Sequence, residues 1–133
     1  MERIRVVLAD DEELAVRHLQ RLLGPYPAVD VVGVAADGLQ AVELVDRLQP
    51  DLVFVDVEMP GLSGFQVLKA IRHRPMAVVI TAHGRYRQMA LESEAIECLV
   101  KPVDAEQMQR AMGKIEGLVE AAGRLHRRNG DPR

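Results

Sequence analysis

The 133-residue sequence contains no tryptophan, two phenylalanines, two tyrosines and a single cysteine. Its core must therefore be aliphatic, and Cys98 has no partner for an internal disulfide, so we expect a protein of the reducing cytoplasm. Apolar runs are short, and the first residues lack the hydrophobic stretch of a secretory signal. We expect a soluble protein without membrane spans.

An excess of charge of one sign is also lacking, because 17 basic and 20 acidic residues leave a net charge of -3. Such a balance creates no field that would recruit nucleic acid or an anionic membrane. The length suits one domain with a core of its own. We predict that this domain spans residues 1–122 and that residues 123–133, where the helical pattern is lost, form a tail or the start of a linker.

Apolar runs with the composition of strands alternate with segments of helical periodicity. The strand candidates are residues 4–9, 29–35, 52–55, 76–80 and 96–100, and the helix candidates are residues 14–23, 38–49, 64–72, 86–93 and 104–122. The helix expected at 86–93 has the weakest pattern and should be the least firmly packed. Parallel strands need crossover connections, so the alternation predicts an α/β domain with a parallel five-stranded sheet and helices on both faces.

The most informative stretch is the strand candidate that ends at Asp56. Its apolar residues predict burial, and the Pro and Gly residues that follow predict a shaped turn. In open α/β sheets, ligands bind just outside the carboxyl ends of the strands, which is where Asp56 should lie. Polar residues also follow three other strand candidates: Asp10, Asp11, Thr81 and Lys101. A parallel sheet would bring all of them to one edge.

Each of these residues alone has a structural explanation, such as helix capping by the acids, but together they predict a phosphoryl-transfer site. Three carboxylates share a small space at low cost only if a cation lies among them, and hard oxygen ligands suit Mg²⁺. The Asp56 carboxylate can act as a nucleophile towards phosphorus and form an aspartyl phosphate. Lys101 would balance charge on the phosphoryl oxygens, and the Thr81 hydroxyl would donate a hydrogen bond to them.

Four ordered motifs carry a resemblance to a known family: Asp10-Asp11, Asp56-Val-Glu-Met-Pro-Gly-Leu-Ser-Gly64, Thr81-Ala82 and Lys101-Pro102-Val103-Asp104. Over about residues 3–122 the chain resembles the receiver domain of two-component response regulators, most closely the LytR/AlgR type. The resemblance implies a flavodoxin-like, doubly wound (βα)5 sandwich of strand order 2-1-3-4-5. It also implies that a sensor histidine kinase phosphorylates Asp56. The Mg²⁺ ligands would be Asp11, Asp56 and the Glu58 backbone carbonyl, with Asp10 assisting through water.

The same resemblance implies what phosphorylation controls. In receivers, the surface formed by the fourth helix, the fifth strand and the fifth helix switches and often dimerises. Regulators of this type usually carry a C-terminal DNA-binding domain, which this chain lacks. Two accounts therefore stay open: a stand-alone receiver that acts by protein contact, or a fragment of a bacterial-type transcription regulator that would contact DNA only through that domain. We favour the fragment, with a homodimer as a further expectation.

Four positions are expected to tune or transmit the switch. Receivers commonly have Tyr or Phe three residues before the Lys, where this chain has Cys98. A thiol is too small to relay a ring rotation, so we expect the response to pass through Tyr86 and its helix. Glu58 and His83 would flank the phosphoryl group, where they could repel a donor or pair to gate water. The remaining histidines lack the spacing of metal ligands and are interpreted as surface residues: His18, His73 and His126.

Two other functions fit parts of this pattern. A magnesium-dependent phosphatase that works through an aspartyl phosphate would use a second carboxylate two residues after the nucleophile, where Glu58 stands, but the chain has no long insertion to enclose a substrate. A pseudo-receiver would bind partners without phosphorylation, but the intact acids, Thr81 and Lys101 argue against it. We expect a signalling phosphoacceptor rather than an enzyme, limited to self-phosphotransfer and autodephosphorylation.

Overall fold

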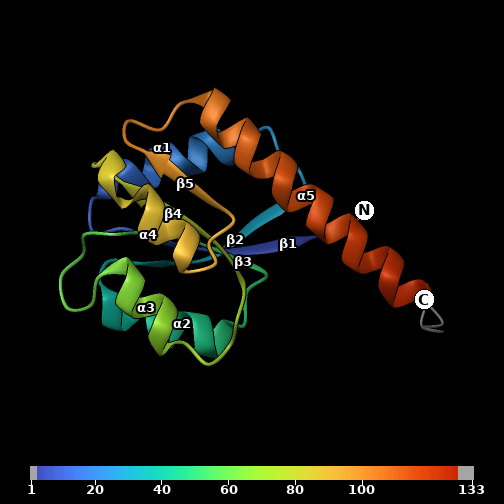
Figure 1. Cartoon of the computed structure of the whole chain (residues 1–133), viewed down its shortest axis with the longest axis horizontal. Helices are drawn as coiled ribbons and strands as arrows, with labels where there is room; N and C mark the ends of the chain where they lie inside the picture. The colour runs from blue at the N-terminus through green and yellow to red at the C-terminus, as the bar shows by residue number, and fades with distance from the viewer. Residues whose placement is uncertain (1–2, 129–133) are drawn as a thin grey trace.

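The structure is a computed structural model that describes residues 3–128, with side chains described as far as Gly123. Five parallel strands alternate with helices along the chain (Figure 1). The elements are β1 (Ile4–Ala9), α1 (Glu13–Leu23), β2 (Val29–Ala35), α2 (Gly38–Leu48), β3 (Leu52–Asp56), α3 (Gly64–Ala70), β4 (Met76–Thr81), the 3-10 turn η1 (Gly84–Tyr86), α4 (Arg87–Glu92), β5 (Glu97–Val100) and α5 (Ala105–Arg128).

The strands form one sheet of order β2-β1-β3-β4-β5, which confirms the topology that the resemblance implied. Ala9 pairs with Val55, and one residue later Asp56 pairs with Ile80. This register places the carboxyl ends of the central strands at the same level. The ends of β1, β3, β4 and β5 therefore share one edge of the sheet, as the site prediction requires.

Two aliphatic cores lie on opposite faces of the sheet. Because successive strand residues point to opposite faces, Phe54 belongs to the core under α1 and α5, and its neighbours Val53 and Val55 belong to the core under α2, α3 and α4. Figure 1 shows α1 and α5 together on one side and α2 and α3 on the other. All of β3 is buried, as its apolar composition predicted.

The ends of α3 and α5 differ from expectation by more than one residue. The helix α3 ends at Ala70 rather than at residue 72 and begins with a capping box between Ser63 and Gln66. The helix α4 is only six residues long and follows a 3-10 turn, in agreement with its weak pattern. The helix α5 continues to Arg128, so the expected end at residue 122 was wrong.

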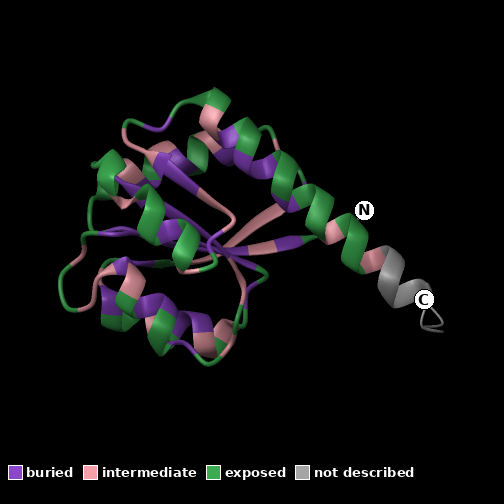
Figure 2. Ribbon diagram, in the orientation of Figure 1, coloured by how far each residue is buried: buried purple, intermediate pink, exposed green. Residues whose placement is uncertain are grey.

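The extension of α5 has a physical reason. The buried side chains of α5 lie in its first half (Figure 2), because the helix passes beyond the sheet, but the residues after the apolar stripe are mostly good helix formers. The helix therefore continues beyond the point where its buried apolar residues end. Residues 129–133 of the predicted tail lie outside the described residues. Within residues 3–128, none of the helices is both long and apolar enough to cross a bilayer.

Candidate functional site

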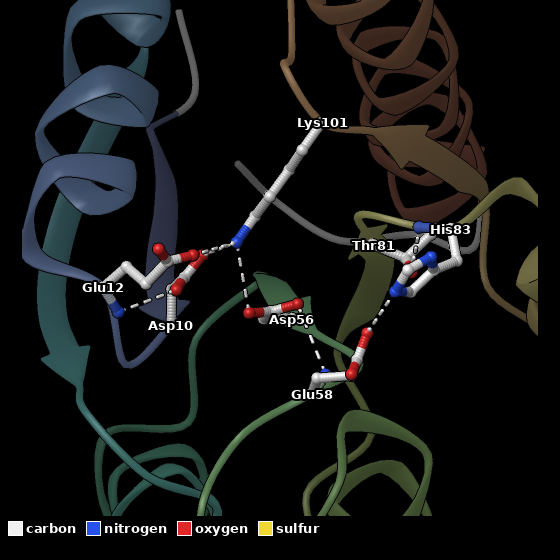
Figure 3. A network of polar contacts seen from close by, with 7 residues as sticks. All are labelled: Asp10, Glu12, Asp56, Glu58, Thr81, His83 and Lys101. Atoms are coloured by element: carbon white, nitrogen blue, oxygen red, sulfur yellow. Dashed lines mark hydrogen bonds and ion pairs between the residues drawn. The ribbon is translucent and has the colours of Figure 1, made fainter.

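The predicted site residues meet at the carboxyl edge of the sheet (Figure 3). Three carboxylates, those of Asp10, Asp11 and Asp56, each place an oxygen within 4.8 Å of the others. Asp10 and Asp56 are buried, with 2% and 4% of their surfaces exposed, and Asp11 is exposed. A buried acid pair with one exposed acid gives a site that is open to solvent on one side.

The chain folds tightly around the end of β3. The backbone N–H of Val57 donates to the carbonyl of Ile80 at 2.8 Å, and the N–H of Gly64 donates to the carbonyl of Val57 at 2.9 Å. A Cβ atom at Gly64 would lie 2.4 Å from the carbonyl oxygen of Asp56, closer than any side chain tolerates. The glycine therefore lets the start of α3 pass directly against the strand end that presents Asp56.

Lys101 connects the acidic residues from the end of β5. Its Nζ atom lies 3.0 Å from Asp10 Oδ2, 3.2 Å from Asp56 Oδ2 and 3.1 Å from Glu12 Oε1 (Figure 3). Burial alone would lower the pKa of the Lys101 ammonium, but the nearby carboxylates of Asp10 and Asp56 raise it above its usual value. The lysine is therefore a permanent positive charge beside Asp56.

The environment of Asp56 works against its ionisation. Burial, followed by the nearby charge of Asp10, raises the pKa of the Asp56 carboxyl to about 6, although Lys101 opposes the shift. Asp10 Oδ2 is buried and makes no well-aligned hydrogen bond within the described residues, although the Lys101 ammonium lies close to it. The acid cluster thus carries more negative charge than the protein groups around it neutralise.

The donor set fits a hard divalent cation. All three side chains that converge offer carboxylate oxygens, without sulfur or imidazole nitrogen. The exposed position of Asp11 leaves room for water in the coordination shell, which suits Mg²⁺. A cation among the acids would also offset the repulsion that raises the pKa of Asp56.

A second group of polar contacts lies on the opposite side of Asp56. The backbone N–H of Glu58 donates to Asp56 Oδ1 at 3.3 Å, and Glu58 Oε1 lies 3.3 Å from His83 Nε2. Of the two arrangements that the sequence left open for this pair, the structure contains the paired one. The Thr81 hydroxyl accepts a hydrogen bond from the His83 backbone N–H at 3.0 Å. This bond does not use the hydrogen of the Thr81 hydroxyl.

Cys98 and Tyr86 belong to the core under α2, α3 and α4 or pack against it, rather than lying at the acid cluster. Cys98 is buried in the core under α2, α3 and α4, and burial raises the pKa of its thiol. Tyr86 packs against the same core, with its ring centre 6.0 Å from that of Phe65 and 6.3 Å from that of His83. These ring contacts therefore run from the histidine beside Thr81 through Tyr86, the residue that precedes α4, to Phe65 of α3.

Several contributors were missed by the sequence reasoning. Glu12, the N-cap residue of α1, makes no side-chain cap and instead lies with Oε1 3.1 Å from Lys101 Nζ. The interpretation of His18 and His73 as surface residues was wrong, because both are half-buried and each places Nε2 2.6 Å from a backbone carbonyl. The side chain of His126 lies outside the described part of the chain. No local pattern marks contacts between residues so distant in sequence.

Comparison with known proteins now decides the family. The response regulator receiver domain family matches residues 6–113, which is most of the chain. The chain belongs to the response regulator receiver domain family. The acid cluster and Lys101 are thus found together at the sheet edge of a receiver domain.

Relatives of this receiver domain include regulators of transcription by name. It is 32% identical over 114 residues to the transcriptional regulatory protein BtsR of Salmonella typhi, covering 84% of this chain and 48% of that protein. It is 36% identical over 114 residues to a response regulatory protein of Vibrio cholerae, covering 83% of this chain and 44% of that protein. The chain thus spans about half the length of the curated relatives it matches. These names do not specify the LytR/AlgR type, which stays a prediction.

Solved structures agree with the family. The receiver domain of AraT from Geobacillus stearothermophilus matches with a TM-score of 0.82 at 28% identity, covering 90% of this chain and 98% of that chain. The response regulatory domain of mrkE from Klebsiella pneumoniae matches with a TM-score of 0.81 at 26% identity, covering 89% and 99%. The fold assignment therefore rests on both sequence and structure.

Proposed function

We propose that this receiver domain is a phosphoacceptor that takes a phosphoryl group onto Asp56 from a phosphorylated histidine of a sensor kinase. The observation that supports this most is the position of the Asp56 carboxylate, buried at the sheet edge between two further acids and the Lys101 ammonium. A carboxylate with a fixed cation beside it can form a bond to phosphorus while the charge of the phosphoryl oxygens is balanced.

In the proposed reaction, an oxygen of ionised Asp56 attacks phosphorus and the P–N bond of the donor breaks. The electron pair of that bond returns to the donor imidazole, which leaves neutral when its other nitrogen carries a proton. Lys101 already lies 3.2 Å from Asp56 Oδ2 and would remain beside the phosphoryl oxygens. Thr81 would turn the free hydrogen of its hydroxyl towards them.

Mg²⁺ would supply additional positive charge for the phosphoryl oxygens when it is bound. We propose Asp11, Asp56 and the Glu58 backbone carbonyl as its direct ligands, with Asp10 acting through water. The fit rests on the convergence of the three carboxylates and on the incompletely neutralised Asp10.

The proposed output is transcription, controlled through a DNA-binding domain outside this chain. Support comes from the names and the length of the relatives, of which this chain covers about half. The switched surface would be that of α4, β5 and α5, through which two copies could also associate, in the cytoplasm. With Cys98 at the usual aromatic position, the ring contacts of Tyr86 would carry the response to α4. Amide shifts on activation that stop at the loop after Thr81 would contradict this route.

The phosphatase alternative is tested by turnover. In the structure, Glu58 pairs with His83 rather than standing free as a general acid. Within one lifetime of the phosphoryl adduct, we expect the protein with Mg²⁺ to release no more than about one equivalent of p-nitrophenol per chain from p-nitrophenyl phosphate. Release that continues over many equivalents and disappears in Glu58→Gln would instead assign the site to a hydrolase.

A further inference from the structure

The loop that carries Lys101 is held from two helices. From α5, Gln107 accepts the N–H of Val100 at 2.9 Å and donates to the carbonyls of Val100 and Pro102 at 3.1 and 3.3 Å. From α1, His18 lies with Nε2 2.6 Å from the carbonyl oxygen of Val103, 85 residues away in sequence. A carbonyl only accepts, so His18 donates through Nε2–H.

The two contacts differ in what they join. Gln107 ties the loop to the helix that directly follows it. His18 lies on α1, which begins at Glu13, immediately after the acids Asp10 and Asp11. The bond from His18 to Val103 therefore connects the segment that presents the acids with the segment that presents the lysine.

Packing fixes this connection only in part, although the Val103 side chain is buried in the core under α1 and α5. An open, largely apolar cavity of about 380 Å³ lies between α1 and the loop, bordered by Leu14, Leu19 and Pro102 as well as by His18 and Val103. Side chains on either side of such a space leave the loop room to shift. A directed hydrogen bond across its margin restricts that movement.

We infer that His18 is a positioning residue, which holds the loop so that the Lys101 ammonium reaches both Asp10 and Asp56. The observation is that this bond joins the loop of Lys101 to the helix that follows Asp10, whose Oδ2 lies 3.0 Å from Nζ. The position of the same loop also determines the 3.2 Å from Nζ to Asp56 at the end of β3. The effect on phosphoryl transfer rests on the proposed function, but the placement of Lys101 can be measured without it.

The chain offers a matched control for the structural part of this role. His73 is also half-buried and also donates through Nε2 to a carbonyl at 2.6 Å, that of Pro50. Pro50 and His73 precede β3 and β4, so this bond lies at the amino edge of the sheet, away from the acids. Replacement of either histidine by leucine removes an equivalent bond.

The first measurement needs no phosphoryl donor. Lysines are labelled with an amine-reactive ester in the wild-type protein, His18→Leu and His73→Leu, and Lys101 labelling is compared by mass spectrometry with that of exposed Lys69. We expect Lys101 to be labelled at least about threefold faster in His18→Leu only, because its ammonium leaves the acids. Equal labelling of Lys101 in all three proteins would overturn the inference.

The second measurement follows the phosphoryl adduct formed with phosphoramidate and Mg²⁺. We expect His18→Leu to slow adduct formation at least about threefold, His73→Leu to change it less than twofold, and His18→Gln to recover most of the rate. In a Lys101→Met background, His18→Leu should have no further effect. Effects that multiply fully would overturn the inference, whereas a wild-type protein without an adduct would contradict the proposed function and leave the labelling result to decide the position of Lys101.

Discussion

The two sides of Asp56 differ in how far they are exposed to water (Figure 3). On one side, the side chains of Asp10, Asp56 and Lys101 are 0%, 6% and 21% exposed. On the other side, those of His83 and Glu58 are 46% and 57% exposed, although His83 Nε2 and Glu58 Oε1 lie only 3.3 Å apart. Similar interatomic distances therefore occur in very different surroundings.

This difference in exposure predicts different roles for the two sides of Asp56. Charges interact more strongly when they are removed from water, and a displaced partner leaves an uncompensated buried charge. Exposed pairs contribute about 0–1 kcal/mol and are weakened by salt. We therefore expect the buried side to decide whether Asp56 reacts, and the exposed side to adjust how long the product lasts.

The largest expected effect on stability comes from Gly64, which lets the start of α3 pass directly against the strand end that presents Asp56. Gly64→Ala places a methyl group 2.4 Å from the Asp56 carbonyl, and we expect it to lower the free energy of unfolding by about 3 kcal/mol. Gly84→Ala is the control at the exposed side, where the nearest atom would be Arg87 Nε at 3.9 Å, and should change stability by less than about 0.5 kcal/mol. Urea denaturation measures the stability of both variants, and equal losses would contradict the distinction between the buried and the exposed side of Asp56.

The next effect concerns the charge of Asp56. Because the folded protein raises the pKa of this carboxyl from 3.8 to about 6, its ionisation destabilises the fold. The stability associated with the protonated form is complete below pH 3.8 and is lost as the pH rises through about 6. In metal-free buffer we therefore expect Asp56→Asn to be more stable than wild type by about 2 kcal/mol at pH 7.5.

The pH dependence checks the sign of that prediction. The advantage of Asp56→Asn should shrink as the pH falls through 6 and disappear below about pH 4. Glu58→Gln, on the exposed side, should differ from wild type by less than about 0.5 kcal/mol at pH 7.5. A less stable Asp56→Asn at pH 7.5 would mean that Lys101 outweighs burial and Asp10.

The smallest effect is expected from the exposed pair. Glu58→Asn and His83→Ala should each change the lifetime of the phosphorylated protein only a few-fold, because both side chains are largely in water. If the pair gates water, the double variant should resemble either single variant rather than their product. Release of inorganic phosphate from the purified adduct gives the lifetimes, and fully multiplicative effects would argue against pairing.

The parts of the fold and of the site that could be predicted from the sequence are those that the strand topology determines. Apolar runs alternating with helical periodicity predict parallel strands, and parallel strands bring their carboxyl ends together, so Asp56 and Lys101 could be placed at one edge although they are 45 residues apart. The order of the strands came from the resemblance rather than from periodicity. The capping box of Ser63 and Gln66 was legible in the sequence but was missed.

Other contacts in the structure correspond to no recognisable pattern in the sequence. The bond from His18 to Val103 joins a side chain to a backbone carbonyl, and any residue offers that carbonyl. Gln107 could be expected to complete a capping box with Asp104, and its backbone N–H does donate to Asp104 Oδ1. Its side chain, however, turns to the edge strand, where it accepts the N–H of Val100 and donates to the Val100 carbonyl. The tertiary contact with Val100, rather than the local capping box, therefore determines how the Gln107 side chain is used.

The most direct test of the central claim is the intact mass of the protein after incubation with phosphoramidate, with and without Mg²⁺, beside Asp56→Asn. The account predicts one phosphoryl adduct of about 80 Da per chain that forms with Mg²⁺ and is absent from the variant. Failure to form an adduct despite demonstrated Mg²⁺ binding, or an adduct that persists in Asp56→Asn, would contradict the assignment of Asp56 as the phosphoacceptor.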